Sequence, residues 1–403
     1  MTSSTPNKPA AHVEVAQLLR LRHWAISVIG AGSESARDTR SVANIPASVW
    51  RLFFELERCA SIVLHSLASS GAIAELDASA VETLRKTAAT ETQSALHART
   101  EGRELAAIAS RLDSPVVVLK GGVRAIEGDA PALPLVDIDI LVRQGSVGDA
   151  IAELRAAGLG EPLRAMQRHQ AISPAGDRLA VEVHWTTHYD GRALDPGLWE
   201  RLVPLRGVPG LMRLGAQDSL LHLLHHATMI HRQRSVSLRD VYLIGLSAVE
   251  CRGEDLDAVH HELVEDANGW EMAALLNFSN DVASGAPALR DPFLRTSATF
   301  YSGVALLSRP PWQFASKGAL AFALEIELRR VSGWWALRNA ARWRGTGIKS
   351  LTTVADRFPR VGAGVLGIAR AGYYSAVAAS MLPLIRATKE KALHAFVEPG
   401  VPR

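Results

Sequence analysis

Residues 116–142 read VVVLKGGVRAIEGDAPALPLVDIDILV, and this stretch decides the fold. Its first four residues are apolar and predict a buried strand, which ends at Lys120-Gly121-Gly122. A short helix is expected over 123–126, followed by a break rich in proline, alanine and glycine at 128–134. The run 136–142 predicts a second strand. The order is therefore strand, glycine turn, short helix, strand.

Two aspartates, Asp137 and Asp139, lie two residues apart in the second predicted strand. Because side chains alternate along a strand, both carboxylates are expected on one face. Two like charges on an apolar strand repel each other, and a cation between them relieves the repulsion. Mg²⁺ suits this role because it takes carboxylate oxygens and leaves positions for phosphate oxygens. The alternative is an edge strand whose aspartates face water.

The glycine turn favours the metal site over that alternative. Glycines let backbone N–H groups come close to phosphate oxygens, and a following helix N-terminus adds partial positive charge. The sequence order is thus the one that a phosphate site needs.

A third strand is predicted at 179–185, and it carries Glu182 and His184 on one face. A short turn at 174–177 separates it from a strand expected at 163–172, so these two strands should pair as a hairpin. On these residues alone, Glu182 could be the partner of an arginine on a neighbouring strand. His184 could hydrogen-bond Glu182 or the nucleotide, or be a structural histidine.

Three motifs together resemble the signature of the nucleotidyltransferase superfamily with the DNA polymerase beta-like fold: LKG at 119–121, DIDILV at 137–142 and EVHW at 182–185. More narrowly, they are similar to a poorly characterised bacterial nucleotidyltransferase family. The resemblance implies an α+β fold, with a small mixed sheet and helices flanked by N-terminal and C-terminal helical regions. The chain departs from the pattern at Leu133-Pro134, where that family usually has Arg-Pro. It departs again at Gly122, where relatives often have serine.

The resemblance implies a metal-dependent nucleotidyltransferase that moves an NMP from an NTP to an acceptor and releases pyrophosphate. Asp137, Asp139 and Glu182 would be catalytic and would hold Mg²⁺, or Mn²⁺ in its place, with Glu182 as an alternative base. The nucleotide-binding candidates are Lys120, Gly121, Gly122, Arg124 and His184. ATP is the favoured NTP, and the acceptor stays open among a peptide, a sugar, a lipid head group, a tRNA end and a small metabolite. No stable nucleic-acid complex is expected.

Two other functions compete with this one. The first is a catalytically weak or inactive scaffold protein with the same fold, favoured by Leu133 and Gly122, which docks a membrane or an acidic partner through a basic C-terminal region. The second is a zinc enzyme built on His222 and His226, which share one helix face. That helix lacks the HExxH glutamate, so a structural or nucleotide-adjacent role is preferred for both histidines. Three arginines after this helix could reach a triphosphate: Arg232, Arg234 and Arg239.

With 48% hydrophobic residues, the chain has the composition of a globular protein. Its length of 403 residues predicts two or three structural units. The only cysteines, Cys59 and Cys251, give neither zinc spacing nor a disulfide framework, which fits the cytoplasm. Residues 301–403 hold 15 Lys/Arg against 5 Asp/Glu, whereas the rest holds 29 against 36. This basic region suggests an acidic partner or peripheral association with a membrane surface; solvated helices are the alternative.

Five regions are predicted: a disordered lead (1–12), an N-terminal helical region (13–112), the nucleotidyltransferase core (113–212), a helical domain (213–292) and the basic C-terminal helical region (293–403). Helices are expected at 13–29, 46–76 as one long stretch, 80–112, 147–157, 219–230, two within 255–289, and 318–342. The segment 361–385 is nearly long enough to span a bilayer, but Arg370 lies inside it. A buried or interfacial helix is therefore predicted there.

Overall fold

The structure is a computed structural model that describes residues 11–30, 39–129, 131–160, 169–172, 178–187, 195–230, 236–266, 269–285, 291–307 and 363–396. Its contacts divide the chain into two compact units. The larger unit consists of Leu21–Ile230 and Val236–Pro292, and the other of Met1–Arg20, His231–Ser235 and Phe293–Arg403. Every residue predicted to form the catalytic site belongs to the larger unit. The five predicted regions remain predictions as domains.

The N-terminal helices are α1 (Ala11–Gly30), α2 (Ala47–Glu57) and α3 (Ala60–Ser70), with short turns η2 (Thr39–Val42) and η3 (Ala72–Glu75). The single long helix predicted from residue 46 is wrong, because the chain breaks at Arg58. Arg58 adopts the left-handed conformation with φ 53° and donates its N–H to Phe54 O, which ends α2. The buried Glu91 carboxylate then accepts the Ala60 and Ser61 N–H groups that begin α3. A distant residue therefore caps α3, which local periodicity does not reveal.

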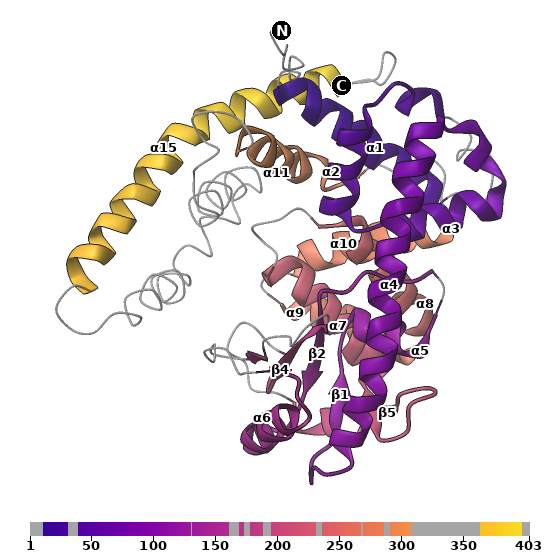
Figure 1. Ribbon diagram of the computed structural model, residues 1–403, viewed down its shortest axis with the longest axis vertical. Helices are drawn as coiled ribbons and strands as arrows, with labels where there is room; N and C mark the ends of the chain where they lie inside the picture. Colours follow the sequence, from indigo (N-terminus) through magenta and orange to yellow (C-terminus); the bar gives the residue numbers. More distant parts are fainter. Residues whose placement is uncertain are drawn as a thin grey trace, which may run out of the picture. The chain divides into compact units, whose positions relative to one another are not determined.

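Helix α4 (Ala78–Ala109) links these helices to the sheet. It contacts α2 and α3 as well as α5 (Gly121–Glu127) and α6 (Val147–Ala156), and Figure 1 shows it passing beside both groups. Its buried side chains Leu105 and Ile108 belong to the same apolar cluster as strand residues Val116 and Ile140. This helix was predicted at 80–112, within a few residues of its observed bounds.

The sheet has six strands in the order β3-β4-β2-β1-β6-β5. Their bounds are β1 (Val116–Val118), β2 (Asp137–Leu141), β3 (His169–Ile172), β4 (Ala180–His184), β5 (Val203–Pro204) and β6 (Leu211–Arg213). β2 is antiparallel to β1 and parallel to β4, and β3 and β4 form the predicted antiparallel hairpin. The mixed sheet with flanking helices confirms the predicted α+β class. β5 and β6 were missed because they are short, and because Pro204 lies in β5 and Pro209 between the two strands.

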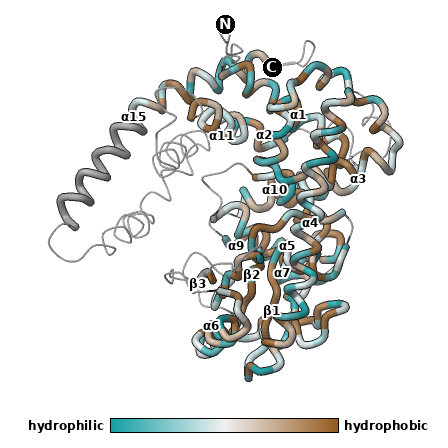
Figure 2. Tube along the Cα trace, in the orientation of Figure 1, coloured by the Kyte–Doolittle hydropathy of each residue, from teal (hydrophilic) through white to brown (hydrophobic). Residues whose placement is uncertain are grey.

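The two faces of the sheet have different surroundings. One face packs Val118, Ile138 and Val181 against the helices in a large apolar cluster. The other face carries a smaller cluster that contains Val117, Leu119 and Leu141. Figure 2 shows the hydrophobic colour along β1 and β2. Asp137 and Asp139 alternate with Ile138, so their side chains share the face of the smaller cluster.

The remaining helices of the larger unit follow the sheet strands. They are α7 (Ala216–His225), α8 (Leu238–Glu250), α9 (Glu254–Glu265) and α10 (Gly269–Ser284), with short turns η4 (Gln144–Ser146) and η5 (Pro196–Trp199). α7 contacts α8, α9 and α10, and α10 contacts α8 and α9. The helix predicted at 219–230 is corrected: α7 ends at His225, and η6 (His226–Ile230) is a turn of π-helix. Such wide turns are rare and often lie at functional sites.

In the other unit, α11 (Leu294–Leu307) packs against α15 (Ala363–Phe396). The predicted helix at 361–385 thus forms part of a longer one. No described helix combines the length and the apolar character that crossing a bilayer requires. The helix predicted at 318–342 lies outside the described residues.

Candidate active site

The glycine turn after β1 holds Lys120 in a conformation that lysine rarely adopts. Its φ is 54° and its ψ is −135°, a combination favoured almost only by glycine. The turn closes through a hydrogen bond from Gly122 N to Leu119 O of 3.2 Å. This geometry accompanies a contact of 3.0 Å between Lys120 Nζ and Asp139 Oδ1. A strained backbone that holds a charged side chain against an acid is typical of a functional site.

Three predicted site residues meet beside this lysine. Asp139 and Glu182 are directly paired on the parallel strands β2 and β4. Nε2 of His184, two residues after Glu182, lies 2.7 Å from Asp139 Oδ1 and 3.6 Å from Glu182 Oε2. One ligand atom from each of the three residues lies within 4.8 Å of the other two. The sequence prediction that Glu182 approaches the aspartate strand agrees with this geometry.

Asp137 joins the cluster electrostatically rather than through a short contact. It lies on the same strand face as Asp139 and is half-buried. Burial, followed by the charges of Asp139 and Glu182, raises the pKa of the Asp137 carboxyl, although Lys120 and Arg58 oppose this shift. Three acidic groups therefore crowd one region, as the paired aspartates of the sequence suggested.

Asp139 and His184 hold each other in charged forms. Burial by itself would raise the pKa of Asp139, but the Lys120 ammonium and then the His184 hydrogen bond and charge hold that pKa well below its usual range. Burial opposes the charged imidazole of His184, but its hydrogen bonds with Asp139 and Glu182 raise its pKa above the usual value. His184 thus favours the charged carboxylate of Asp139, as Lys120 does.

Two further histidines reach the same group from α7 and η6. His222 is buried, and burial followed by the charges of Lys120 and His184 lowers its pKa to about 3. The charge of His226 contributes to the low pKa of Asp139. The His222 and His226 rings lie 6.2 Å apart between centroids. Among the described residues, neither belongs to the group of His, Asp and Glu side chains spaced to share a metal ion. Their position beside Asp139 agrees with the nucleotide-adjacent interpretation and gives no support to a separate zinc site.

Both glycines of the turn have close neighbours. A Cβ atom at Gly121 would lie 2.5 Å from Nη2 of Arg239, the residue that follows the start of α8. A Cβ atom at Gly122 would lie 3.0 Å from Val118 Cγ1. The absence of a serine at position 122 therefore matches tight packing against β1, and the Arg239 guanidinium lies directly over the turn.

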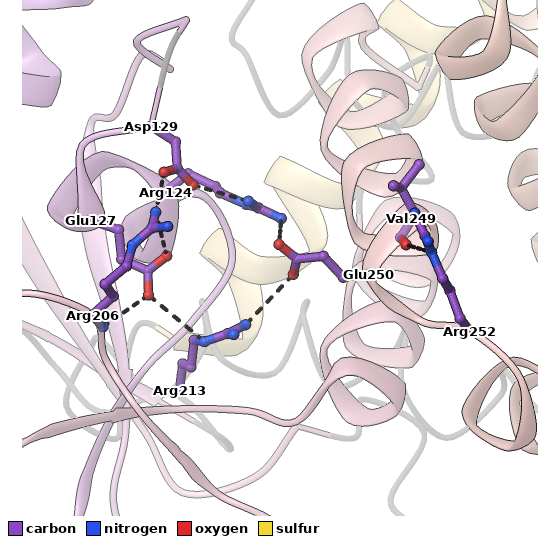
Figure 3. A network of polar contacts seen from close by, with 8 residues as sticks. All are labelled: Arg124, Glu127, Asp129, Arg206, Arg213, Val249, Glu250 and Arg252. Carbon is purple, nitrogen blue, oxygen red and sulfur yellow. Dashed lines mark hydrogen bonds and ion pairs between the residues drawn. The ribbon is translucent and has the colours of Figure 1, made fainter.

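Arg124 lies in a different environment from the other nucleotide-binding candidates. Its guanidinium contacts Asp129 at 3.0 Å and Glu250 at 2.8 Å. Figure 3 shows it within a network that also includes Glu127, Arg206 and Arg213 and joins α5, α8 and the β5–β6 strands. Because carboxylates already hold this guanidinium, we assign Arg124 a structural role and leave it out of the proposed site.

The donor atoms fit a divalent metal ion. Two carboxylates and one imidazole come from adjacent strands, and a third carboxylate, Asp137, lies on the same face. Carboxylate oxygens suit Mg²⁺ and Mn²⁺, and an added imidazole nitrogen favours transition metals over Mg²⁺. Oδ1 of Asp139 already contacts Lys120 and His184. A bound ion would therefore share this carboxylate with the Lys120 ammonium and the His184 ring.

Sequence reasoning missed Arg58. Among the described non-glycine residues only Asn44, Arg58 and Lys120 have positive φ, and two of these three belong to the site region. Asp137 lies within electrostatic range of Arg58. No local motif indicates this residue, because it lies at a helix end about eighty residues before Asp137 in the sequence. Two of the arginines suggested to reach a triphosphate, Arg232 and Arg234, lie outside the described residues.

Comparison with known proteins agrees with this geometry. The family model described as uncharacterised nucleotidyltransferase matches residues 52–279, which include every residue of the cluster. Searches of curated proteins and of solved structures found no match. The match covers more than half of the 403 residues. The chain therefore belongs to this nucleotidyltransferase family.

Proposed function

We propose that this protein is a metal-dependent nucleotidyltransferase that moves an NMP from an NTP to an acceptor nucleophile and releases pyrophosphate. The observation that carries the proposal is the convergence of Asp139, Glu182 and His184 within 4.8 Å, beside a lysine in strained backbone. Membership of the family supports the general reaction class.

The polar groups of the site divide into an acidic side and a phosphate side. Asp137, Asp139 and Glu182 would hold the ion, Mg²⁺ or Mn²⁺. The glycine turn would offer backbone N–H groups to the phosphates, with the Lys120 ammonium next to them. Such an ion, when bound, neutralises phosphate charge and polarises the phosphorus under attack.

In the alternative in which the two aspartates hold the ion without it, Glu182 is the group best placed to accept a proton from the acceptor. Its side chain is 27% exposed, whereas that of Asp139 is 9% exposed, so an incoming acceptor can reach Glu182 more easily. His184 Nε2 lies 3.6 Å from Glu182 Oε2. The acceptor oxygen would lose its proton to Glu182 as it bonds to the α-phosphorus, and the bond to pyrophosphate would break.

The finer features of the reaction are part of the proposal. ATP is the favoured NTP, and the acceptor is a peptide, sugar, lipid head group, tRNA end or small metabolite. The proposed location is the cytoplasm, with weak association with a membrane surface as the further expectation.

One observation favours the alternative of a scaffold protein with little catalysis. The Asp139 carboxylate already contacts Lys120 at 3.0 Å and His184 at 2.7 Å, so part of its charge is balanced by the protein itself. In that case the same cluster would serve the stability of the sheet. The two alternatives differ in whether an NTP with Mg²⁺ or Mn²⁺ binds.

Incubation with each NTP labelled on the α-phosphate, in a cell lysate with Mg²⁺ or Mn²⁺, tests the reaction. We expect an acceptor to become labelled by the wild type but not by Asp139→Asn or Glu182→Gln. Asp113→Asn, which changes an exposed aspartate before β1, is the matched control and should transfer label normally. Equal labelling by wild type and Asp139→Asn would contradict the proposed reaction.

A further inference from the structure

A buried ionic link joins the end of α2 to the start of α8. Glu57 Oε2 accepts from Leu238 N at 2.7 Å and from Arg22 Nη1 at 2.8 Å. The Glu57 and Arg22 side chains are 1% and 0% exposed, and Arg22 also contacts Asp291 at 2.6 Å. Breaking such a pair costs several kcal/mol, so the two helix ends are firmly joined. Arg58 and Arg239 are the next residues along the chain after Glu57 and Leu238, so they leave neighbouring points of the backbone.

The two arginines carry like charges and lie at the edge of the site. Arg239 Nη2 lies against Gly121 of the turn, and Arg58 Nη2 donates to Pro134 O at 3.3 Å, in the loop that leads into β2. Burial and then the charge of Arg239 lower the pKa of Arg58 to about 10, which shows that the guanidinium groups affect each other. Together they flank the path from the glycine turn to the aspartates.

The neighbouring acids leave much of this positive charge available. Asp240 lies 3.9 Å from Arg239 Nη1, but its other oxygen is bound by Ser237 Oγ at 2.8 Å. Within the described residues, Arg58 makes no ion pair within 4.0 Å, and Nε of Arg239 is buried without a hydrogen-bond partner. Two crowded guanidiniums with spare N–H donors are suited to an oxyanion, because each presents a planar fork that matches phosphate.

We propose that Arg58 and Arg239 form a polyphosphate clamp, which binds the phosphate chain of the nucleotide against the Lys120-Gly121-Gly122 turn. This inference rests on the proposed nucleotidyl transfer for the nature of its ligand. Arg58 comes from the helical region that precedes the catalytic core in the sequence, and the clamp gives it a role in binding the nucleotide. The clamp also explains why glycine stands at 121, since any side chain there would displace the Arg239 guanidinium.

Titration of the full chain with inorganic tripolyphosphate, followed by calorimetry, tests the clamp directly. Arg58→Met and Arg239→Met should each weaken binding by about tenfold or more, because a phosphate loses a bidentate charged partner. Arg111→Met, which removes an arginine paired with Glu153 on the surface, should leave binding unchanged. Wild-type affinity in both clamp variants would overturn the inference, as would a wild-type chain that does not bind tripolyphosphate.

A thermal shift separates the clamp from a purely structural role. In a clamp, tripolyphosphate raises the midpoint of the wild type but not that of Arg58→Met or Arg239→Met. In a structural role, the substitutions would lower the midpoint without anion and leave the shift on addition intact, which counts against the clamp. If the Met variants do not fold, Arg58→Lys and Arg239→Lys keep the charge but lose the fork, and reduced binding is expected of them.

The outcome also distinguishes the clamp from the reaction. Loss of tripolyphosphate binding in the arginine variants, without label transfer by the wild type, would support the clamp and contradict the proposed function. Label transfer that depends on Asp139, combined with normal tripolyphosphate binding in the arginine variants, would support the proposed function and contradict the clamp.

Discussion

Asp139 and Glu182 lie directly opposite each other on the parallel strands β2 and β4. Their side chains share one face of the sheet, and His184 bridges them, 2.7 Å from Asp139 and 3.6 Å from Glu182. Because side chains alternate along a strand, a shift of one residue in either strand would separate the two carboxylates. The register between β2 and β4 is therefore the feature on which the site depends.

Replacing Asp137 should improve stability while it impairs transfer. Burial and the charges of Asp139 and Glu182 raise the Asp137 pKa, so ionisation of this carboxyl destabilises the folded chain at neutral pH. We expect Asp137→Asn to be at least as stable as the wild type in urea unfolding at pH 7. The gain should vanish as the pH falls below the ordinary pKa of the carboxyl, where it is protonated in both states. A marked loss of stability in Asp137→Asn at pH 7 would instead show that its charge is needed by Arg58 or Lys120.

The strained turn predicts an unusual order of stability at position 120. Lys120 has φ 54° and ψ −135°, a conformation that costs a residue with a side chain about 1–3 kcal/mol relative to glycine. Lys120→Gly should therefore unfold at a higher denaturant concentration than Lys120→Ala, and both should lose NTP binding. Ser146, the residue before α6, has φ −100° and provides the matched position. The Gly-to-Ala difference should be smaller there, and an equal difference would mean that Lys120 is not strained.

His222 should give the protein an acid-sensitive stability. Its folded pKa is about 3 against the usual 6.5, mainly because it is buried. Below the usual value the unfolded chain takes up a proton and the folded chain does not, so the unfolding free energy falls as the pH drops, by up to about 1.4 kcal/mol per pH unit. Denaturant unfolding at several pH values should show a shallower acid limb for His222→Asn. His261→Asn, at a residue with a 78% exposed side chain, should keep the wild-type slope.

The network around Arg124 predicts a structural rather than a binding phenotype. Arg124, with a side chain 15% exposed, is held by Asp129 and Glu250. Arg124→Met should lower the unfolding free energy by about 1–3 kcal/mol and leave ATP affinity unchanged. Arg206→Met, in the same network at a side chain 68% exposed, should cost no more than about 0.5 kcal/mol. Weaker ATP binding at unchanged stability would restore the predicted nucleotide contact.

The local elements and the acidic cluster could be predicted because short-range rules determine them. Alternation put Asp137 and Asp139 on one face, and the apolar runs at 116–119 and 179–185 marked neighbouring strands. The glycine turn was visible as a break between a strand and a short helix. The position of Glu182 beside Asp139 followed from the family resemblance rather than from any local rule, because strand order depends on long-range pairing.

What could not be predicted depends on tertiary contacts. The break at Arg58 depends on Glu91, more than thirty residues away, which caps α3. The approach of Arg58 to Arg239 depends on the buried link through Glu57. The π-turn that begins at His226 interrupts a stretch that its apolar spacing predicts as one continuous helix. Each of these features lies at or beside the site, where packing overrides local propensity.

The most direct test of the central claim is calorimetric titration of the full chain with ATP in the presence and absence of Mn²⁺ or Mg²⁺. We predict that ATP binds the wild type with an affinity that the metal ion raises about tenfold or more, and that Asp139→Asn and Glu182→Gln abolish this metal dependence while Asp113→Asn retains it. Binding of ATP that is equally strong without metal, or a metal dependence that survives in both variants, would contradict a metal site at Asp139 and Glu182.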